Sequence, residues 1–181
     1  MIGTELSPIQ PSWVPPNVKF EIDDANLEWT WSDNSFDFIH VRFLVGAIKD
    51  WGSLYREAFR CCKPGGWLES HEPSLQFRSG SGLITEESPM GQWNKVFEES
   101  VKVTGRTFRL VDEDQQKKLM EEAGFVDIVV KDIQVPFGDW PKDRKEKELG
   151  MFTKVAILSD LEGKSGFILV NHLTYIALML T

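Results

Sequence analysis

The 181-residue chain has few cysteines, no long apolar run and no dense basic segment. Its two cysteines, Cys61 and Cys62, are adjacent, and neighbouring cysteines can join only in a strained ring, so we expect two reduced thiols near a helix end. The longest apolar stretch, 173–180, is far shorter than the roughly 20 residues that a membrane span needs. The N-terminus shows no charged segment followed by an apolar one, as a secretory signal would have. These features favour a reduced intracellular compartment, cytoplasmic or nuclear.

The charge balance is acidic, with 20 basic and 28 acidic residues and a formal net charge of -8. An acidic surface repels phosphate backbones, so we expect no direct nucleic-acid binding. Hydrophobic residues make up 41% and charged residues 27% of the chain, as in ordinary globular proteins. The length fits one domain rather than two, and the composition argues against disorder over most of the chain.

Strand and helix patterns alternate along the chain. Apolar, β-forming runs predict strands at 1–6, 18–22, 36–44, 67–72 and 125–135. Helical spacing of apolar residues predicts helices at 50–60, 90–103, 112–123 and 149–161. Residues 63–66, Lys-Pro-Gly-Gly, predict a sharp turn that ends the first helix. This order is typical of an open parallel sheet, in which ligands lie beyond the carboxyl ends of the strands.

Acidic side chains stand where three of the predicted strands end: Glu5, Asp23, Asp24, Glu69 and Glu72. A carboxylate only accepts hydrogen bonds, so it can hold the hydroxyls of a ribose or an exocyclic amine. A single exposed acid is usually just a surface residue. The joint placement of these acids at strand ends is what predicts a nucleoside site.

Several motifs resemble those of class I S-adenosylmethionine-dependent methyltransferases, and in the same order: Glu5-Leu6-Ser7, Asp23-Asp24-Ala25, 33–37 and Lys63-Pro64-Gly65-Gly66. Longer strings are similar to the fungal LaeA-like methyltransferases associated with secondary metabolism: 2–11, 13–17, Glu28-Trp29-Thr30-Trp31, Ile39-His40-Val41-Arg42 and Asp50-Trp51. The resemblance runs from Ile2 to about Glu162. It implies an α/β fold built on the three-layer, Rossmann-like class I methyltransferase sheet, with S-adenosylmethionine as cofactor.

The resemblance also implies which residues hold the adenosine end of the cofactor. Glu5 would hold the ribose hydroxyls, and Leu6 would lie against the adenine. Asp24 would accept a hydrogen bond from the adenine amino group, with the Ala25 backbone beside the ring.

His40, Val41 and Arg42 would line the methionine end of the same pocket by this resemblance. Arg42 would pair with a carboxylate, either the cofactor's or one from the 67–72 strand. A general base helps only a hydroxyl or acidic-carbon acceptor, and a histidine can accept a proton near neutral pH. His40 and His71 are therefore the candidate catalytic residues, with structural histidines as the alternative reading. We expect no metal site.

The family pattern opens with a strand and a Gly-rich loop, whereas Gly3 is the only glycine in the first 45 residues here. We therefore expect a sheet that is incomplete at both ends, without its first, central strand. The expected domains are a truncated methyltransferase domain at 1–162 and a divergent apolar tail at 163–181. Because a missing strand leaves sheet edges unpaired, we expect a protein partner or a dimer to cover them.

The leading function hypothesis is S-adenosylmethionine-dependent methyl transfer to a small molecule, in secondary metabolite biosynthesis or its regulation. The alternatives are a non-catalytic regulatory or scaffold protein, and a fold fragment that works with a partner supplying the missing strand. The acceptor pocket is expected in the variable segment 76–103. Four apolar side chains there favour an apolar acceptor: Phe77, Met90, Trp93 and Phe97.

Four tryptophans gather around the first predicted strands: Trp13, Trp29, Trp31 and Trp51. Packing in the core and loops is the favoured interpretation. The alternative is that one ring faces the sulfonium cation.

Overall fold

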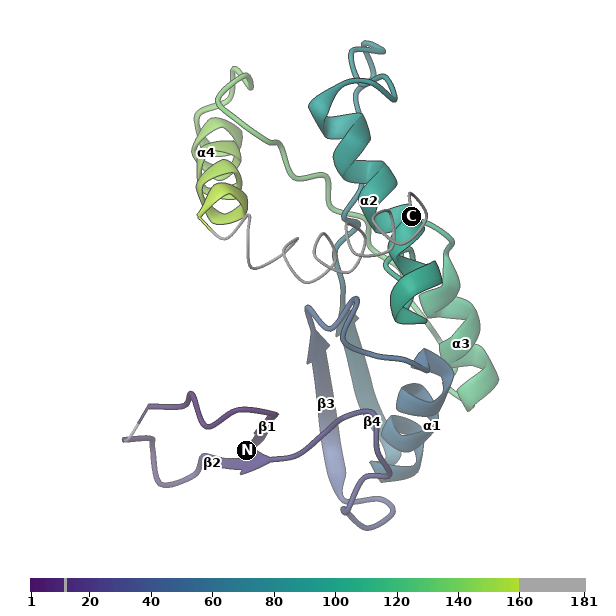
Figure 1. Cartoon of the computed structure of the whole chain (residues 1–181). Helices are drawn as coiled ribbons and strands as arrows, with labels where there is room; N and C mark the ends of the chain where they lie inside the picture. Colours follow the sequence, from purple (N-terminus) through teal and green to yellow (C-terminus); the bar gives the residue numbers. More distant parts are fainter. Residues whose placement is uncertain (12, 160–181) are drawn as a thin grey trace, which may run out of the picture. The chain divides into compact units, whose positions relative to one another are not determined.

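The computed structural model of this chain describes residues 1–11 and 13–159, which form two compact units (Figure 1). Of the described residues, the first unit comprises Met1–Ser74 and Arg106–Ile128, and the second comprises Leu75–Gly105 and 129–159. The four strands that the described residues form belong to the first unit, as do the helices α1 (Trp51–Cys61) and α3 (Gln115–Ala123). The predicted boundary at residue 162 lies outside the described residues, so the division at that point stays a prediction.

The strands of the first unit pair in parallel, as the sequence predicts. β1 (Ile2–Glu5) pairs with β2 (Lys19–Ile22), and β3 (Phe36–Arg42) pairs with β4 (Cys62–His71). The four strands do not join, however, and each pair is a separate two-stranded sheet within the described residues (Figure 1). Each sheet therefore keeps free edges, whose backbone groups are available to a further strand.

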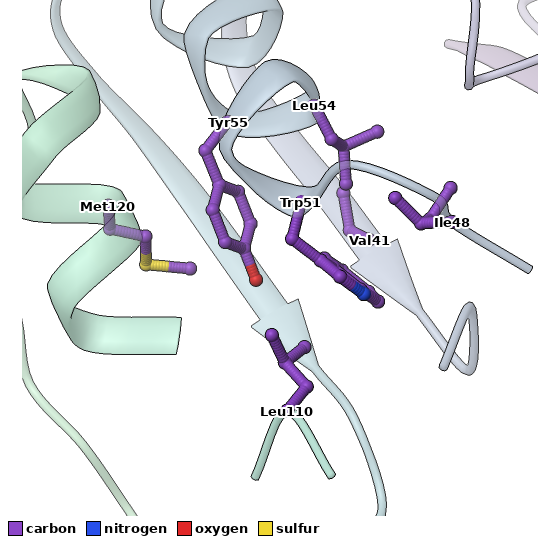
Figure 2. Packing of buried hydrophobic residues seen from close by; sticks show 7 residues of the cluster. All are labelled: Val41, Ile48, Trp51, Leu54, Tyr55, Leu110 and Met120. Atoms are coloured by element: carbon purple, nitrogen blue, oxygen red, sulfur yellow. The ribbon is translucent and has the colours of Figure 1, made fainter. Parts of the chain in front are cut away.

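The helix α1 (Trp51–Cys61) is confirmed and covers one face of the β3–β4 sheet. It begins at Asp50, whose carboxylate accepts a hydrogen bond from Ser53 N at 2.9 Å. Its buried side chains recur every three or four residues, the spacing of one helix face. They form the core of the first unit with residues from β3 and from later segments (Figure 2): Val41, Ile48, Trp51, Leu54, Tyr55, Leu110 and Met120.

The helix α3 (Gln115–Ala123) packs against α1 and begins three residues later than the sequence predicts. Asp114 precedes it with a left-handed backbone, φ 51°, which cannot continue into a preceding helical turn. The helix ends as predicted at Gly124, whose φ of 112° favours glycine. From α3, Gln116 Nε2 donates to Ser70 Oγ at 3.0 Å, and that hydroxyl also meets Tyr55 Oη at 3.0 Å.

The Lys-Pro-Gly-Gly segment is a bulge inside β4 rather than a turn before it, which corrects the sequence prediction. Phe36 lies opposite Cys62 and Phe38 opposite Trp67, so residues 63–66 all face a single position of β3. Gly65 has a φ of 79°, and a side chain at Gly66 would meet the Asp37 carbonyl oxygen at 2.9 Å. The glycines are therefore needed for the bulge itself.

The predicted strand at 125–135 is wrong, because the structure forms no strand there. Val126 and Val129 are 81% and 86% exposed, and Val130 and Ile133 are also exposed. Alternating apolar residues make a strand only when another strand supplies hydrogen-bond partners, and within the described residues no strand pairs with this segment.

The second unit contains the helices α2 (Pro89–Thr104) and α4 (Arg144–Leu158). The first agrees with the prediction, between Ser88 as N-cap and Gly105 as a left-handed C-cap. The second begins five residues before the predicted start at 149. It starts there because Asp143 is its N-cap: the Asp143 carboxylate accepts from Lys145 N and Glu146 N, both at 3.0 Å.

The segment between β2 and β3 is held by Arg60, at the end of α1. Its guanidinium donates to the carbonyl oxygens of Trp29 at 2.9 Å and Trp31 at 2.8 Å, and to Asp33 at 2.8 Å. Glu57 accepts from Arg60 and from Trp29 N. From the sequence alone, only the basic residue in the last turn of the helix hints at this arrangement.

Three of the four tryptophans pack as the favoured interpretation expects, and Trp13 does not. Trp29 and Trp31 meet edge to face with ring centroids 5.4 Å apart, and Trp51 is 3% exposed in the core. Trp13 is 77% exposed.

The two cysteines lie at the junction of α1 and β4, and both are buried free thiols, as predicted. Burial raises the pKa of Cys61 and of Cys62 above that of an exposed thiol. Over the part of the chain that the structure describes, no helix is long and apolar enough to span a bilayer.

Candidate cofactor site at the strand ends

The carboxyl ends of β1 and β2 lie side by side and form a rim of acidic residues. Glu5, the last residue of β1, lies opposite Ile22, the last residue of β2. Asp23 N donates to the Glu5 carbonyl oxygen at 3.2 Å, and Asp24 follows directly. Glu5 and Asp24, the two acids that the family resemblance assigns to adenosine, therefore stand at the same end of one parallel sheet.

Glu5 and Leu6 are both exposed at this rim. One carboxylate oxygen of Glu5 accepts from Leu6 N at 2.8 Å, which fixes the direction of the side chain. The second oxygen is available to an external donor. The Leu6 side chain is 61% exposed and offers an apolar surface beside that carboxylate.

Asp24 is half-buried, and Asn26 holds its carboxylate in place. The Oδ1 atom of Asp24 accepts from both Asn26 N and Asn26 Nδ2, each at 2.9 Å. The backbone N–H of Asn26, followed by its side-chain amide, lowers the pKa of Asp24. Ala25, between them, packs against the core of the unit. The carboxylate of Asp24 is therefore oriented through its Oδ1 atom.

Asn26 also reaches the loop that follows β3. Its Nδ2 donates to the Ala47 carbonyl oxygen at 3.2 Å, and its Oδ1 accepts from Lys49 N at 2.8 Å. Between those two residues, Ile48 is 2% exposed in the core. Asn26 therefore ties the rim of the β1–β2 sheet to an anchored loop of the β3–β4 sheet.

The residues expected at the methionine end alternate between the two faces of β3. Val41 is 6% exposed in the core, so only its backbone is available to a ligand. His40 lies on the opposite, exposed face, and its Nδ1 is 2.7 Å from Glu69 Oε2 on β4. The Arg42 guanidinium lies over the Phe43 ring, 5.5 Å from its centroid.

His71, the second candidate base, ends β4 opposite Arg42 on the same exposed face as His40. Its ring centroid is 5.8 Å from that of Phe43. The structure thus brings His40, Arg42 and His71 together on one surface of the β3–β4 sheet.

Glu72 has a structural position rather than one at the open rim. It is 9% exposed, and its two oxygens accept from Leu44 N at 3.0 Å and Val45 N at 2.8 Å. Burial raises the pKa of Glu72, and the two backbone donors oppose that rise. Glu72 thus stabilises the start of the loop after β3, and Asn26 binds the same loop further along, at Ala47 and Lys49.

Sequence reasoning missed the role of Asn26. The sequence does contain a signal, namely an aspartate after a predicted strand. The side chain of such an aspartate commonly accepts from the backbone N–H two residues later, which forms an Asx turn. The expectation of no metal site is not tested by the structure; across residues 1–11 and 13–159 no group of three or more histidine, cysteine or acidic side chains is placed to hold an ion.

Parallel strand pairs with a helix on a sheet face define an incomplete α/β fold. The family comparison is more specific, since the methyltransferase-domain family matches residues 1–130. The chain belongs to this methyltransferase-domain family.

Named relatives come from fungi. The chain is 36% identical over 162 residues to methyltransferase pytC of Aspergillus terreus, and this match covers 90% of the chain and 49% of pytC. It is 34% identical over 174 residues to the probable methyltransferase tdiE of Emericella nidulans, covering 96% and 53%. It is 31% identical over 165 residues to the secondary metabolism regulator LAE1 of Cochliobolus heterostrophus, covering 90% and 53%. The chain thus spans about half the length of these relatives, and no solved structure matches it.

Proposed function

We propose that this chain takes part in S-adenosylmethionine-dependent methyl transfer to a small molecule, in secondary metabolite biosynthesis or its regulation. The observation that carries the proposal is the shared rim of Glu5 and Asp24 at the ends of two parallel strands. Family membership and relatives named as methyltransferases and as a secondary metabolism regulator support it.

The rim fits the adenosine end of the cofactor. An adenosine presents two adjacent ribose hydroxyls and one exocyclic amine, all hydrogen-bond donors, and the rim presents two acceptor-only carboxylates. Glu5 would accept from the ribose hydroxyls and Asp24 from the amine. Leu6 would cover the ring, and the Ala25 backbone would lie beside it.

The cofactor supplies a methyl group already activated on a sulfonium. What this chain must add is alignment of the acceptor and exclusion of water. His40 is oriented by Glu69, which would direct its other ring nitrogen as a proton acceptor for a hydroxyl substrate. Val41, through its backbone, and Arg42 would line the methionine end, and His71 is the alternative base.

We also propose that the finer fold is the three-layer class I methyltransferase architecture, with a further strand between the two sheets. Both sheets have free edges, and Phe38 and Trp67 are 56% and 68% exposed on the face away from α1. A protein partner or a second copy would cover these surfaces. Buried free thiols support a reducing compartment, cytoplasmic or nuclear.

The acceptor pocket is proposed in the second unit. Within it, Phe77 packs against Trp93 and Phe137 with ring centroids 6.0 and 5.0 Å apart, and Trp93 packs against Phe97 at 4.9 Å. This cluster supports an apolar acceptor.

A second candidate function is a non-catalytic regulatory or scaffold role. The observation that favours it is the similarity to proteins named as secondary metabolism regulators. Such a protein would use the exposed sheet surfaces to bind other proteins and would not need to turn over cofactor.

Calorimetric titration of the purified chain with S-adenosylhomocysteine tests the enzyme proposal. We expect saturable binding that Glu5→Ala and Asp24→Ala each weaken about tenfold or more, since each removes hydrogen bonds to a charged group. Glu122→Ala, an exposed acid on α3, is the matched control and should bind as the parent does. No heat at millimolar ligand would contradict the enzyme proposal, and the hydrodynamic size of the same sample separates a monomer from a complementing dimer.

A further inference from the structure

The contacts of Asn26 at the rim assign it a role that the family likeness does not. The backbone N–H of Asn26 donates to Asp24, and its side-chain amide donates to Asp24 and to the Ala47 carbonyl oxygen. Its amide oxygen accepts from Lys49 N. A surface asparagine ordinarily bonds to water, so four directed contacts over two segments indicate a structural clamp.

The clamp acts on one oxygen of Asp24. Because Oδ1 of Asp24 accepts from both Asn26 donors, its rotamer is fixed and only Oδ2 remains for an external donor. The other end of the clamp is equally fixed, since Ala47 and Lys49 flank Ile48, which is 2% exposed. The position of Asp24 Oδ2 is therefore set by the core through Asn26.

We propose that Asn26 is the positioning residue that makes the site select adenine, by aiming Asp24 Oδ2 at the 6-amino group. The proposal rests on the proposed function, because it concerns the same cofactor site. A carboxylate that is already held in one orientation loses less rotamer entropy on binding than a freely rotating carboxylate does. Its hydrogen bond to a well-placed donor therefore contributes more binding free energy.

Electrostatics support the same assignment. Beyond the two bonds from Asn26, the positive charges of Lys49 and Arg106 also lower the pKa of Asp24. Arg106 donates to the Gly46 carbonyl oxygen at 3.4 Å, in the loop that Asn26 grips. Lys49 and Arg106 thus favour the carboxylate form of Asp24, in which both side-chain oxygens only accept hydrogen bonds.

The test compares two ligands by calorimetry: S-adenosylhomocysteine and its analogue with hydrogen in place of the 6-amino group. The parent should prefer the amino ligand about tenfold or more, the value of a hydrogen bond to a charged acceptor. Asn26→Ala should reduce that preference at least threefold. A merely structural role would weaken both ligands equally and leave the preference unchanged.

Two further variants sharpen the comparison. Asn26→Asp keeps the size and the acceptor for Lys49 N but loses both amide donors and places a second carboxylate beside Asp24, so it should also lose the preference even if Asn26→Ala folds poorly. Asn17→Ala is the matched control, because Asn17 is exposed and its backbone oxygen, which the substitution keeps, accepts from the N-terminal amine.

The outcomes are separable. If Asp24→Ala abolishes the preference for the amino ligand while Asn26→Ala and Asn26→Asp retain it, the role of Asn26 is overturned and the proposed function stands. If the parent binds neither ligand, both are overturned.

Discussion

Replacing Glu72 by glutamine tests how the loop after β3 is held. Phe43 starts this loop with a φ of 56°, an uncommon conformation for a residue with a side chain. Glu72 stabilises it by accepting from the next two backbone N–H groups, at 3.0 and 2.8 Å. Glutamine has the same size but only one acceptor oxygen, so one buried N–H loses its partner and faces another donor.

The expected cost is about 1–3 kcal/mol of unfolding free energy, the value of leaving a buried donor unsatisfied. Chemical denaturation monitored by tryptophan fluorescence measures it. The control is Glu69→Gln, which changes an acid of β4 that is 60% exposed and should cost under about 1 kcal/mol. Equal effects of the two substitutions would refute the reasoning.

The pH dependence of the same comparison has a definite sign. Burial raises the pKa of Glu72 in the folded state above its ordinary value near 4.5, so the folded state binds the proton more tightly than the unfolded chain does. The stabilisation is full below the unfolded pKa and is lost as pH rises through the folded pKa. The unfolding free energy of the parent should therefore fall as pH rises through the folded pKa of Glu72, and that of Glu72→Gln should lack this fall. A parent free energy that rises over the same window would show that the fold prefers the carboxylate.

Two other substitutions probe the core of the first unit. Tyr55→Phe removes the hydroxyl that meets Ser70 Oγ, which Gln116 also contacts, and should cost about 1 kcal/mol in a denaturant titration. Burial raises the pKa of Tyr55 to about 12, so its contribution persists to pH 10 and disappears as pH rises through 12; a tyrosinate absorbance titration in which both tyrosines ionise near 10 would contradict this. Leu54→Ala should cost about 2–5 kcal/mol because Leu54 is 2% exposed, whereas Leu83→Ala, at a residue 78% exposed, should change stability by less than about 0.5 kcal/mol; similar thermal shifts for the two would contradict the assigned core.

The elements set by local chemistry were predictable from the sequence. Asp50 is the N-cap of α1, and the apolar residues of this helix recur at the expected spacing. Both features depend only on residues within or next to the helix. The acids at the ends of β1 and β2 could likewise be placed, because the carboxyl ends of parallel strands meet at one edge of a sheet.

The features that depend on distant partners were not predictable in the same way. The segment 125–135 alternates as a strand should, but a strand needs a neighbour, and its own residues do not determine whether one is present. The bulge at 63–66 depends on the position of Asp37 across the sheet, which no local pattern gives. The clamp of Asn26 joins residues 21 and 23 positions apart, and only the folded chain brings them together.

The most direct test of the central claim is an amide NMR titration of the labelled chain with S-adenosylhomocysteine. The account predicts saturable shifts of the amides at the rim, those of Leu6, Ala25 and Asn26, with little change in the exposed helix α4. Shifts confined to the second unit, or none up to millimolar ligand, would contradict an adenosine site at the ends of β1 and β2.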